Sequence, residues 1–150
     1  MIIKTKKVYY CEFCGKRSLA KWSLEKHETH CTANPNRTCR LCGRKEPLSE
    51  LIKKWIAIRE KWMAQSITSD CGNVQFLTAV VEEEMRKEIN VANVQDAIAD
   101  CCPACTLAVI RQANLAYHPI SINYDYKKEL LEWWNCKRDA QQEADEYDPY

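Results

Sequence analysis

Residues 11–31 read Cys11-Glu-Phe-Cys14-Gly-Lys-Arg-Ser-Leu-Ala-Lys-Trp-Ser-Leu-Glu-Lys-His27-Glu-Thr-His-Cys31. This stretch decides the fold of the N-terminal part, because four of its side chains have the spacing of metal ligands. Two thiols lie on a short turn, and two further ligands lie four residues apart on one face of a predicted helix. The stretch therefore predicts a closed tetrahedral zinc site at Cys11, Cys14, His27 and Cys31, with no open position for a substrate.

The residues around this site resemble the zinc finger with two cysteines and two histidines, in the variant whose last histidine is cysteine. Tyr9 stands two residues before the first cysteine, Leu24 stands three residues before the histidine, and the ligand spacings match. The aromatic residue that this family usually has four residues after the second cysteine is missing, because Ser18 is there. We expect Leu19 to replace it. The resemblance covers residues 8–31 and implies a ββα fold.

Two other ligand sets are possible at this site. His30 stands three residues after His27, which is closer than the family spacing, whereas Cys31 stands four residues after it and fits. Alternatively, Cys11 and Cys14 pair with the next Cys-x2-Cys motif as a zinc ribbon, which would leave His27 and Cys31 without a role. The spacing favours Cys31 and a site that is complete within residues 11–31.

A second metal site is predicted from two more pairs, Cys39-Arg-Leu-Cys42 and Cys102-Pro-Ala-Cys105. The glycine after Cys42 permits the tight backbone turn of a zinc knuckle, and the second pair opens a helix predicted at 106–116. A knuckle followed by a helix-borne pair is similar in architecture to treble-clef zinc domains, including the zinc-finger-associated domains of insect transcription factors. Cys101 is an alternative to Cys102, since it stands four residues before Cys105.

The sequence predicts an α-rich α+β fold. An N-terminal ββα zinc finger precedes a mostly helical domain, which a treble-clef-like four-cysteine zinc site staples together. The predicted boundaries are a finger at 1–31, a polar linker at 32–38, a helical zinc domain at 39–144 and an acidic tail at 145–150. Two Zn²⁺ ions per chain are expected.

Helical periodicity supports this organisation. Apolar residues recur every three or four positions in each predicted helix, which places them on one buried face. Trp55 and Trp62 are predicted to be core residues, and a last helix is predicted at about 125–144. The residues that carry the pattern are Leu48, Leu51, Ile52, Trp55, Trp62 and Met63, then Val74, Leu77, Val81, Met85 and Ile89, then Val91, Val94 and Ile98.

Charge is distributed unevenly along the chain. Residues 1–61 contain 15 Lys or Arg against 6 Asp or Glu, whereas residues 62–150 contain 7 against 15, which together give the net charge of +1. A basic half that coincides with the finger indicates an anionic partner, DNA or RNA, bound through phosphates. The candidate nucleic-acid-binding residues are Lys4, Lys6, Lys7, Lys16, Arg17, Lys21, Trp22 and Lys26.

Sequence-specific reading of DNA is not expected. The resemblance implies that the base-facing positions of the finger helix are Ala20, Trp22, Ser23 and Lys26. None of them makes the bidentate contacts of Arg with guanine or Asn with adenine. A single finger also buries too little surface for tight specific binding.

The same motifs do not match the enzyme classes that use similar residues, and no enzyme activity is expected. His27-Glu-Thr-His30-Cys31 has cysteine where a zinc protease needs its second histidine, and the deaminase motif is absent. Nucleases with a His-Asn-His motif also use paired Cys-x2-Cys sequences, but His118 follows the second pair here instead of preceding it. The hypothesis is therefore a zinc-binding regulator that binds nucleic acid; the alternative is a protein-interaction adaptor or inhibitor with purely structural zincs.

The cysteines also indicate the compartment. The N-terminus lacks the apolar region of a signal peptide, and no apolar run is long enough for a membrane span. We therefore expect no membrane partner and a reducing compartment, cytoplasmic or, in a eukaryote, nuclear. Paired Cys-x2-Cys motifs there favour metal over disulfides.

Overall fold

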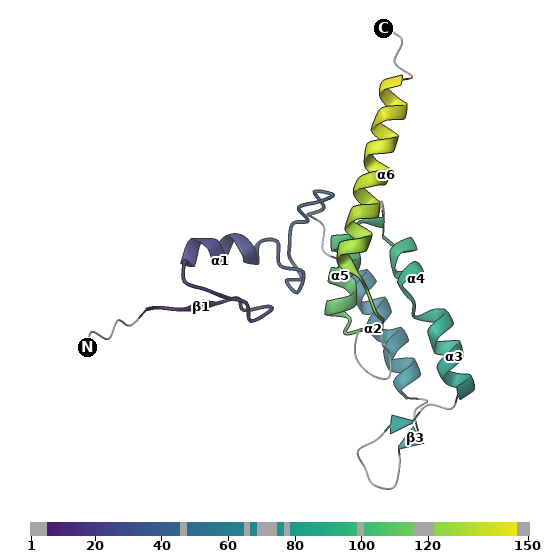
Figure 1. The fold of residues 1–150 in the computed structure, drawn as a ribbon. Coiled ribbons are helices and arrows are strands. Elements are labelled where there is room, and N and C mark those ends of the chain that lie inside the picture. Colours follow the sequence, from purple (N-terminus) through teal and green to yellow (C-terminus); the bar gives the residue numbers. More distant parts are fainter. Residues whose placement is uncertain are drawn as a thin grey trace.

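The computed structural model describes residues 6–45, 48–64, 67–68, 75–76, 79–98, 101–115 and 122–146. The described part is mostly helical, with two small antiparallel sheets (Figure 1). The elements in chain order are β1 (Tyr9–Tyr10), β2 (Arg17–Ser18), α1 (Lys21–Glu28), α2 (Ser49–Met63), β3 (Ile67–Thr68), β4 (Gln75–Phe76), α3 (Ala79–Glu88), α4 (Val91–Asp96), α5 (Pro103–Gln112) and α6 (Tyr126–Glu146).

The N-terminal unit has the expected ββα order. β1 pairs with β2 antiparallel, and α1 packs against both strands. Its small core contains Cys11, Leu24 and Cys31, with Tyr9 and Ala33 packed against them. Two of its three buried residues are predicted metal ligands, so the unit has little apolar core apart from the ligand side chains.

The prediction that Leu19 fills the place of the missing aromatic is wrong. The Leu19 side chain is 62 % exposed. The reason is that α1 begins at Lys21, so Leu19 precedes the helix and does not lie on the face that buries Leu24. Ala33, from the chain after the helix, packs against this core instead.

The remaining helices enclose a second and larger core. α5 is its centre, because it contacts α2, α4 and α6. Trp55 and Trp62 of α2 are buried, as the periodicity predicted, and so are Met85 and Val94 from α3 and α4. Val74 and Leu77, which also belonged to the predicted pattern, lie outside the described residues.

α5 begins earlier than the sequence pattern suggested. Its first residue is Pro103, not Thr106, and Cys102 is the residue before the first turn. Proline suits this position because a backbone N–H in the first turn of a helix has no intrahelical partner, so nothing is lost when proline lacks it. Cys105 therefore lies on the helix itself, and both cysteines are fully buried at its N-terminal end.

Residues 32–38, predicted as a linker, make specific contacts on both sides. Asn34 donates from its side chain to the carbonyl oxygen of Glu28 at 2.8 Å, which ties the segment to α1. On the other side, Gln112 donates to the carbonyl oxygens of Thr32 and Asn34, at 2.8 and 3.2 Å. Arg111 donates to the Thr32 hydroxyl at 2.7 Å. The ββα unit is thus connected to α5 through hydrogen bonds.

α6 is the longest helix and extends away from the other helices at its C-terminal end (Figure 1). Trp133 and Trp134 pack edge to face, with ring centroids 4.9 Å apart. Leu131 and Trp134 are exposed by 63 % and 52 %. Among the described helices, none combines the length and the apolar composition that a membrane span needs.

Candidate metal centres

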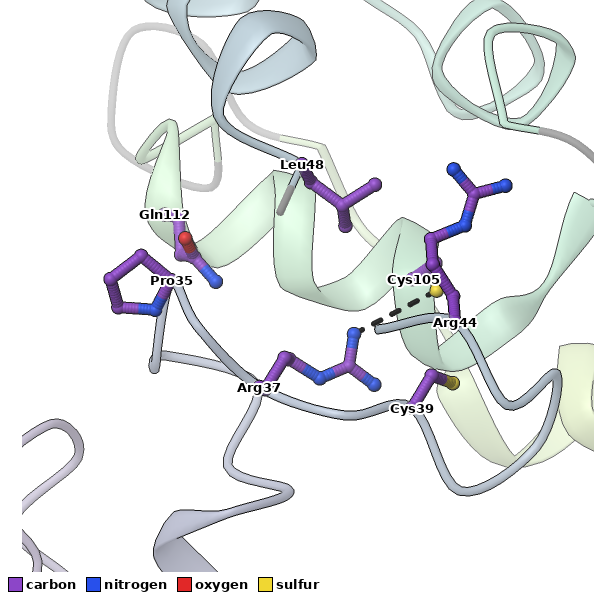
Figure 2. A pocket seen from close by; sticks show the side chains of 7 residues that line it. All are labelled: Pro35, Arg37, Cys39, Arg44, Leu48, Cys105 and Gln112. Atoms are coloured by element: carbon purple, nitrogen blue, oxygen red, sulfur yellow. Dashed lines mark hydrogen bonds between the residues drawn. The ribbon is translucent and has the colours of Figure 1, made fainter. Parts of the chain in front are cut away.

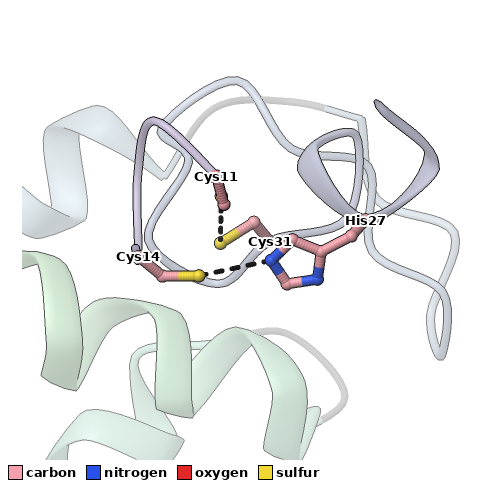
Figure 3. A group of neighbouring side chains, drawn as sticks. All are labelled: Cys11, Cys14, His27 and Cys31. Atoms are coloured by element: carbon pink, nitrogen blue, oxygen red, sulfur yellow. Dashed lines mark hydrogen bonds between the residues drawn. The ribbon is translucent and has the colours of Figure 1, made fainter. Parts of the chain in front are cut away.

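The first cluster brings together the four ligands predicted in the ββα unit. Figure 3 shows Cys11, Cys14, His27 and Cys31 pointing toward a common centre, and all four ligand atoms lie within 4.8 Å of one another. The Sγ atoms of Cys11 and Cys31 are 3.9 Å apart, and Cys14 Sγ is 3.3 Å from His27 Nε2. Zinc–sulfur bonds of about 2.3 Å in a tetrahedron separate two sulfurs by about 3.8 Å. The cluster has the size that a metal ion requires.

A tight turn positions the two cysteines that precede α1. The amide of Cys11 donates to the carbonyl oxygen of Lys16 at 2.8 Å, and the amide of Gly15 donates to the carbonyl oxygen of Cys11 at 3.0 Å. Gly15 has a φ of 70°, in the left-handed region that glycine enters without the Cβ penalty. This turn directs both Sγ atoms to the same side.

The second Cys-x2-Cys pair adopts the same turn. Here the amide of Cys39 donates to the carbonyl oxygen of Arg44 at 2.8 Å, and Gly43 donates to that of Cys39 at 3.0 Å. Gly43 also has a φ of 70°. The two turns share the pattern Cys-x2-Cys-Gly followed by a basic residue. This repeat is visible in the sequence, and it indicates that both glycines serve the same purpose in the turn.

The second cluster joins this turn to the start of α5. The Sγ atoms of Cys39 and Cys102 are 3.7 Å apart, as are those of Cys42 and Cys105, and all four lie within 4.8 Å of one another. Three of the four residues are buried. The N-terminus of α5 adds the positive end of a helix dipole, which stabilises thiolates.

The pKa values of Cys39, Cys102 and Cys105 in the second cluster show three thiols competing to ionise. Hydrogen bonds from Cys102 and Cys105 lower the pKa of Cys39 far below its usual value. The hydrogen bond with Cys102 and that with Cys39 raise the pKa of Cys105 far above it. Four thiolates this close repel one another strongly unless a cation lies between them. The donor set therefore fits a divalent metal ion.

The first cluster is less buried, and its pKa shifts are smaller. Burial raises the pKa of Cys14, but hydrogen bonds from the Lys16 backbone and from His27 outweigh it and bring the value to about 7. Burial raises the pKa of Cys31 to about 11. Cys14 is exposed and His27 half-buried, so water reaches one side of this cluster.

Arg37 is a buried residue beside the second cluster that the sequence pattern did not reveal. Its side chain is 6 % exposed, and its Nη1 donates toward Cys105 Sγ at 3.7 Å (Figure 2). Its Nε is buried and has no hydrogen-bond partner in the described part of the chain. A buried guanidinium is costly unless a negative charge faces it. Four thiolates around a divalent ion supply that charge, because the cluster then carries a net charge of about −2.

The alternative ligands lie outside both clusters. His30 places its Nδ1 2.8 Å from the carbonyl oxygen of Thr38. Cys101 is exposed and has a φ of 44°, whereas Cys102 belongs to the second cluster. The four cysteines of a zinc ribbon are not brought together, since the first two Cys-x2-Cys pairs belong to different clusters. The nine cysteines in the described part are free, and none forms a disulfide.

Seven of the eight predicted nucleic-acid-binding residues belong to the described part, and all seven are exposed on the ββα unit. Trp22 is 69 % exposed and does not pack against the helical core. Lys4 lies outside the described residues. The other six, all exposed, are Lys6, Lys7, Lys16, Arg17, Lys21 and Lys26.

No protein-family model, no curated protein and no solved structure matches this chain.

Proposed function

We propose that the protein is a non-enzymatic zinc-binding module, a small regulator that binds nucleic acid through its basic N-terminal half without strong sequence specificity. Sets of three sulfurs with one imidazole and of four sulfurs are typical of structural zinc. With two such sets, the chain would hold two Zn²⁺ ions. Each set supplies all four ligands of a tetrahedral ion, so neither leaves a position for a substrate. The knuckle and the pair at the start of α5 support a treble-clef-like second site.

The observation that carries the nucleic-acid proposal is the charge of the exposed N-terminal half. Residues 6–45 contain ten Lys or Arg, all but the buried Arg37 at least partly exposed, against three Glu, a net charge of +7. Lys21 pairs with Glu25 at 3.6 Å, but both side chains are more than half exposed. Such a pair is weak in water and can give way to a phosphate. A surface of this kind attracts a polyanion whatever its base sequence.

The exposed face of α1 supports binding without base recognition. Trp22, Ser23 and Lys26 are exposed on this helix, and Ala20 immediately precedes it. These side chains lack the paired donors and acceptors that read base edges. The proposed binding is therefore directed to the backbone.

The test is the salt dependence of binding. Fluorescence anisotropy with a labelled oligonucleotide should show binding at 50 mM salt and a loss of affinity on the order of 10³-fold at 200 mM for about six phosphate contacts. Removing three charges from the N-terminal half should weaken binding, whereas removing three from the helices should not. The matched variants are Lys7→Ala/Lys16→Ala/Lys26→Ala and Lys87→Ala/Lys127→Ala/Lys128→Ala, the second set being exposed residues of α3 and α6. Absence of binding at low salt would contradict the proposal.

A second candidate function, a protein-interaction adaptor, is favoured by α6. Leu131 and Trp134 lie three residues apart on this helix and are both more than half exposed. Exposed aromatic and leucine side chains on one helical face are common anchors for a protein partner. Binding of a protein partner that Trp134→Ala abolishes, with no nucleic-acid binding by the parent, would favour this function over the first.

A further inference from the structure

A shallow groove, which we call the basic groove, lies between the ββα unit and the turn that carries Cys39 and Cys42. We call the turn at Cys11 and Cys14 the first knuckle and the turn at Cys39 and Cys42 the second knuckle. Its volume is about 470 Å³, and its lining residues are Lys16, Ser23, Lys26, His27, His30 and Arg40. Ser23, Lys26 and His27 come from α1, Lys16 from the first knuckle and Arg40 from the second. The groove is thus built jointly by the surroundings of both metal clusters.

The lining has cationic and neutral donors but no carboxylate. The acidic residues of the ββα unit make contacts of their own. Glu25 pairs with Lys21, and Glu28 accepts a hydrogen bond from the amide of Glu12 at 3.1 Å. Lys16, Lys26 and Arg40 are exposed, so they retain water that a ligand can replace. This combination matches the charge and the hydrogen-bonding capacity of phosphate.

The shape of the site favours a single strand over a duplex. A helix that reads the major groove of DNA must project as a ridge. Here Ser23 and Lys26 of α1 form one side of a groove whose lining includes Arg40. This face of α1 therefore belongs to a concave surface and does not project as insertion into a major groove requires. A space of this size is in the range of a pocket for one small ligand, and it fits a backbone segment of one strand.

Trp22 supplies a surface for a base beside the groove. It lies four residues before Lys26 on α1, which places both side chains on the same helical face. Its ring is 69 % exposed. Stacking on an aromatic ring needs an unpaired base, so this residue also favours single-stranded nucleic acid.

We propose that the basic groove holds the phosphate backbone of a single-stranded nucleic acid, and that Trp22 stacks on one of its bases. This inference rests on the proposed function, because it names the form of nucleic acid and the place where it binds. DNA and RNA share the phosphate and the unpaired bases, so probes of both kinds distinguish the source.

The test compares two triple variants that remove the same charge from the same half of the protein. Native mass spectrometry first establishes that both retain the metal content of the parent. The probes are a labelled oligothymidylate, the matching oligouridylate and a DNA duplex of equal length. The groove variant is Lys16→Ala/Lys26→Ala/Arg40→Ala, and the matched variant outside the groove is Lys6→Ala/Lys7→Ala/Arg17→Ala.

The groove variant should lose at least about tenfold more affinity for a single-stranded probe than the matched variant. Trp22→Ala should weaken single-strand binding by about tenfold, and Trp134→Ala should leave it unchanged. An equal loss in the two triple variants would overturn the groove while the proposed function stands. Tighter binding of the duplex than of either single strand, or no effect of Trp22→Ala, would overturn the single-strand assignment. If the parent binds none of the probes, the proposed function fails and the groove fails with it.

Discussion

The guanidinium of Arg37 lies against the thiol of Cys105, with 3.7 Å between Nη1 and Sγ. This contact joins the segment between the two clusters to the first turn of α5. Because the arginine is buried, its charge acts on the cluster at close range and in a medium of low polarity. The residue is therefore expected to control how firmly the second cluster holds its ion.

Arg37→Ala should weaken metal retention at the second cluster. It removes a hydrogen bond to a charged sulfur, which contributes about 1.5–3 kcal/mol in other proteins. A chelator titration followed by native mass spectrometry should show that the second of the two ions to leave, the ion of the second cluster, is lost at a lower chelator concentration than in the parent. Arg37→Lys should be intermediate, because it keeps the charge but loses the planar fork.

The matched control is Arg17→Ala, which removes an exposed arginine from β2. It should leave the chelator titration unchanged. If Arg37→Ala and Arg17→Ala retain both ions to the same chelator concentration, Arg37 has no role in the second cluster.

Metal content should follow the two ligand sets. Native mass spectrometry of the parent should show two zinc ions, and Cys31→Ser and Cys105→Ser should each lose one. His30→Ala should keep both, because His30 faces the carbonyl oxygen of Thr38 and not the first cluster. A parent with one ion would contradict the assignment of two separate sites.

The two ions should leave in a fixed order. Water reaches the first cluster through exposed Cys14 and half-buried His27, whereas Cys102 and Cys105 are fully buried. A chelator should therefore empty the first cluster first and unfold the ββα unit, since zinc supplies the folding free energy of such units. Circular dichroism recorded beside the metal count should show this partial loss of structure before the main helical signal falls. Simultaneous release of both ions would argue against the order.

Gly15→Ala and Gly43→Ala should each destabilise the turn that carries one cysteine pair. A Cβ added at either glycine meets no atom within 4 Å, so the cost comes from the left-handed backbone alone. That cost is about 1–2 kcal/mol per residue. Asparagine tolerates this conformation better, so Gly15→Asn and Gly43→Asn should recover part of the loss. Metal affinity measured by competition with a chromogenic chelator tests this, and equal affinities for the alanine and asparagine variants would argue against backbone strain.

The helical core should depend on Met85, which is 2 % exposed on α3. Met85→Ala should lower the free energy of unfolding by about 2–5 kcal/mol, through lost burial and the cavity that remains. Val80→Ala is the matched control on the same helix, because Val80 is 68 % exposed and should matter little. Denaturant titration at saturating zinc measures both, and similar midpoints would contradict the assignment of Met85 to the core.

The sequence predicted the parts of the fold that depend on local spacing. The ligands of both clusters are set by short intervals such as Cys-x2-Cys, and the buried face of α2 by its period of three to four residues. Leu19 was misplaced because α1 begins only at Lys21, so this residue precedes the helix and its side chain is exposed. Helix ends of this kind depend on cap geometry, which spacing alone does not specify.

Arg37 could not be predicted because its partner is 68 residues away in the chain. A lone arginine in a polar segment has no pattern of its own, and only the fold shows that it is buried. The same holds for Arg40, which stands with α1 in the lining of the basic groove although it belongs to the next knuckle. Gly15 is different, since its repeat with Gly43 is visible in the sequence.

The contact between Cys39 and Cys102 spans 63 positions of the chain. When a metal ion joins them, that stretch becomes a closed loop in the unfolded chain, and by analogy with a disulfide the closure is worth about 4 kcal/mol. The entropy of a loop grows only with the logarithm of its length, so doubling the loop changes this by about 0.6 kcal/mol. The segment from Gly43 to Cys101 is therefore a place where insertions and deletions that spare the core should be tolerated, while the two cysteine pairs at its ends should not be moved.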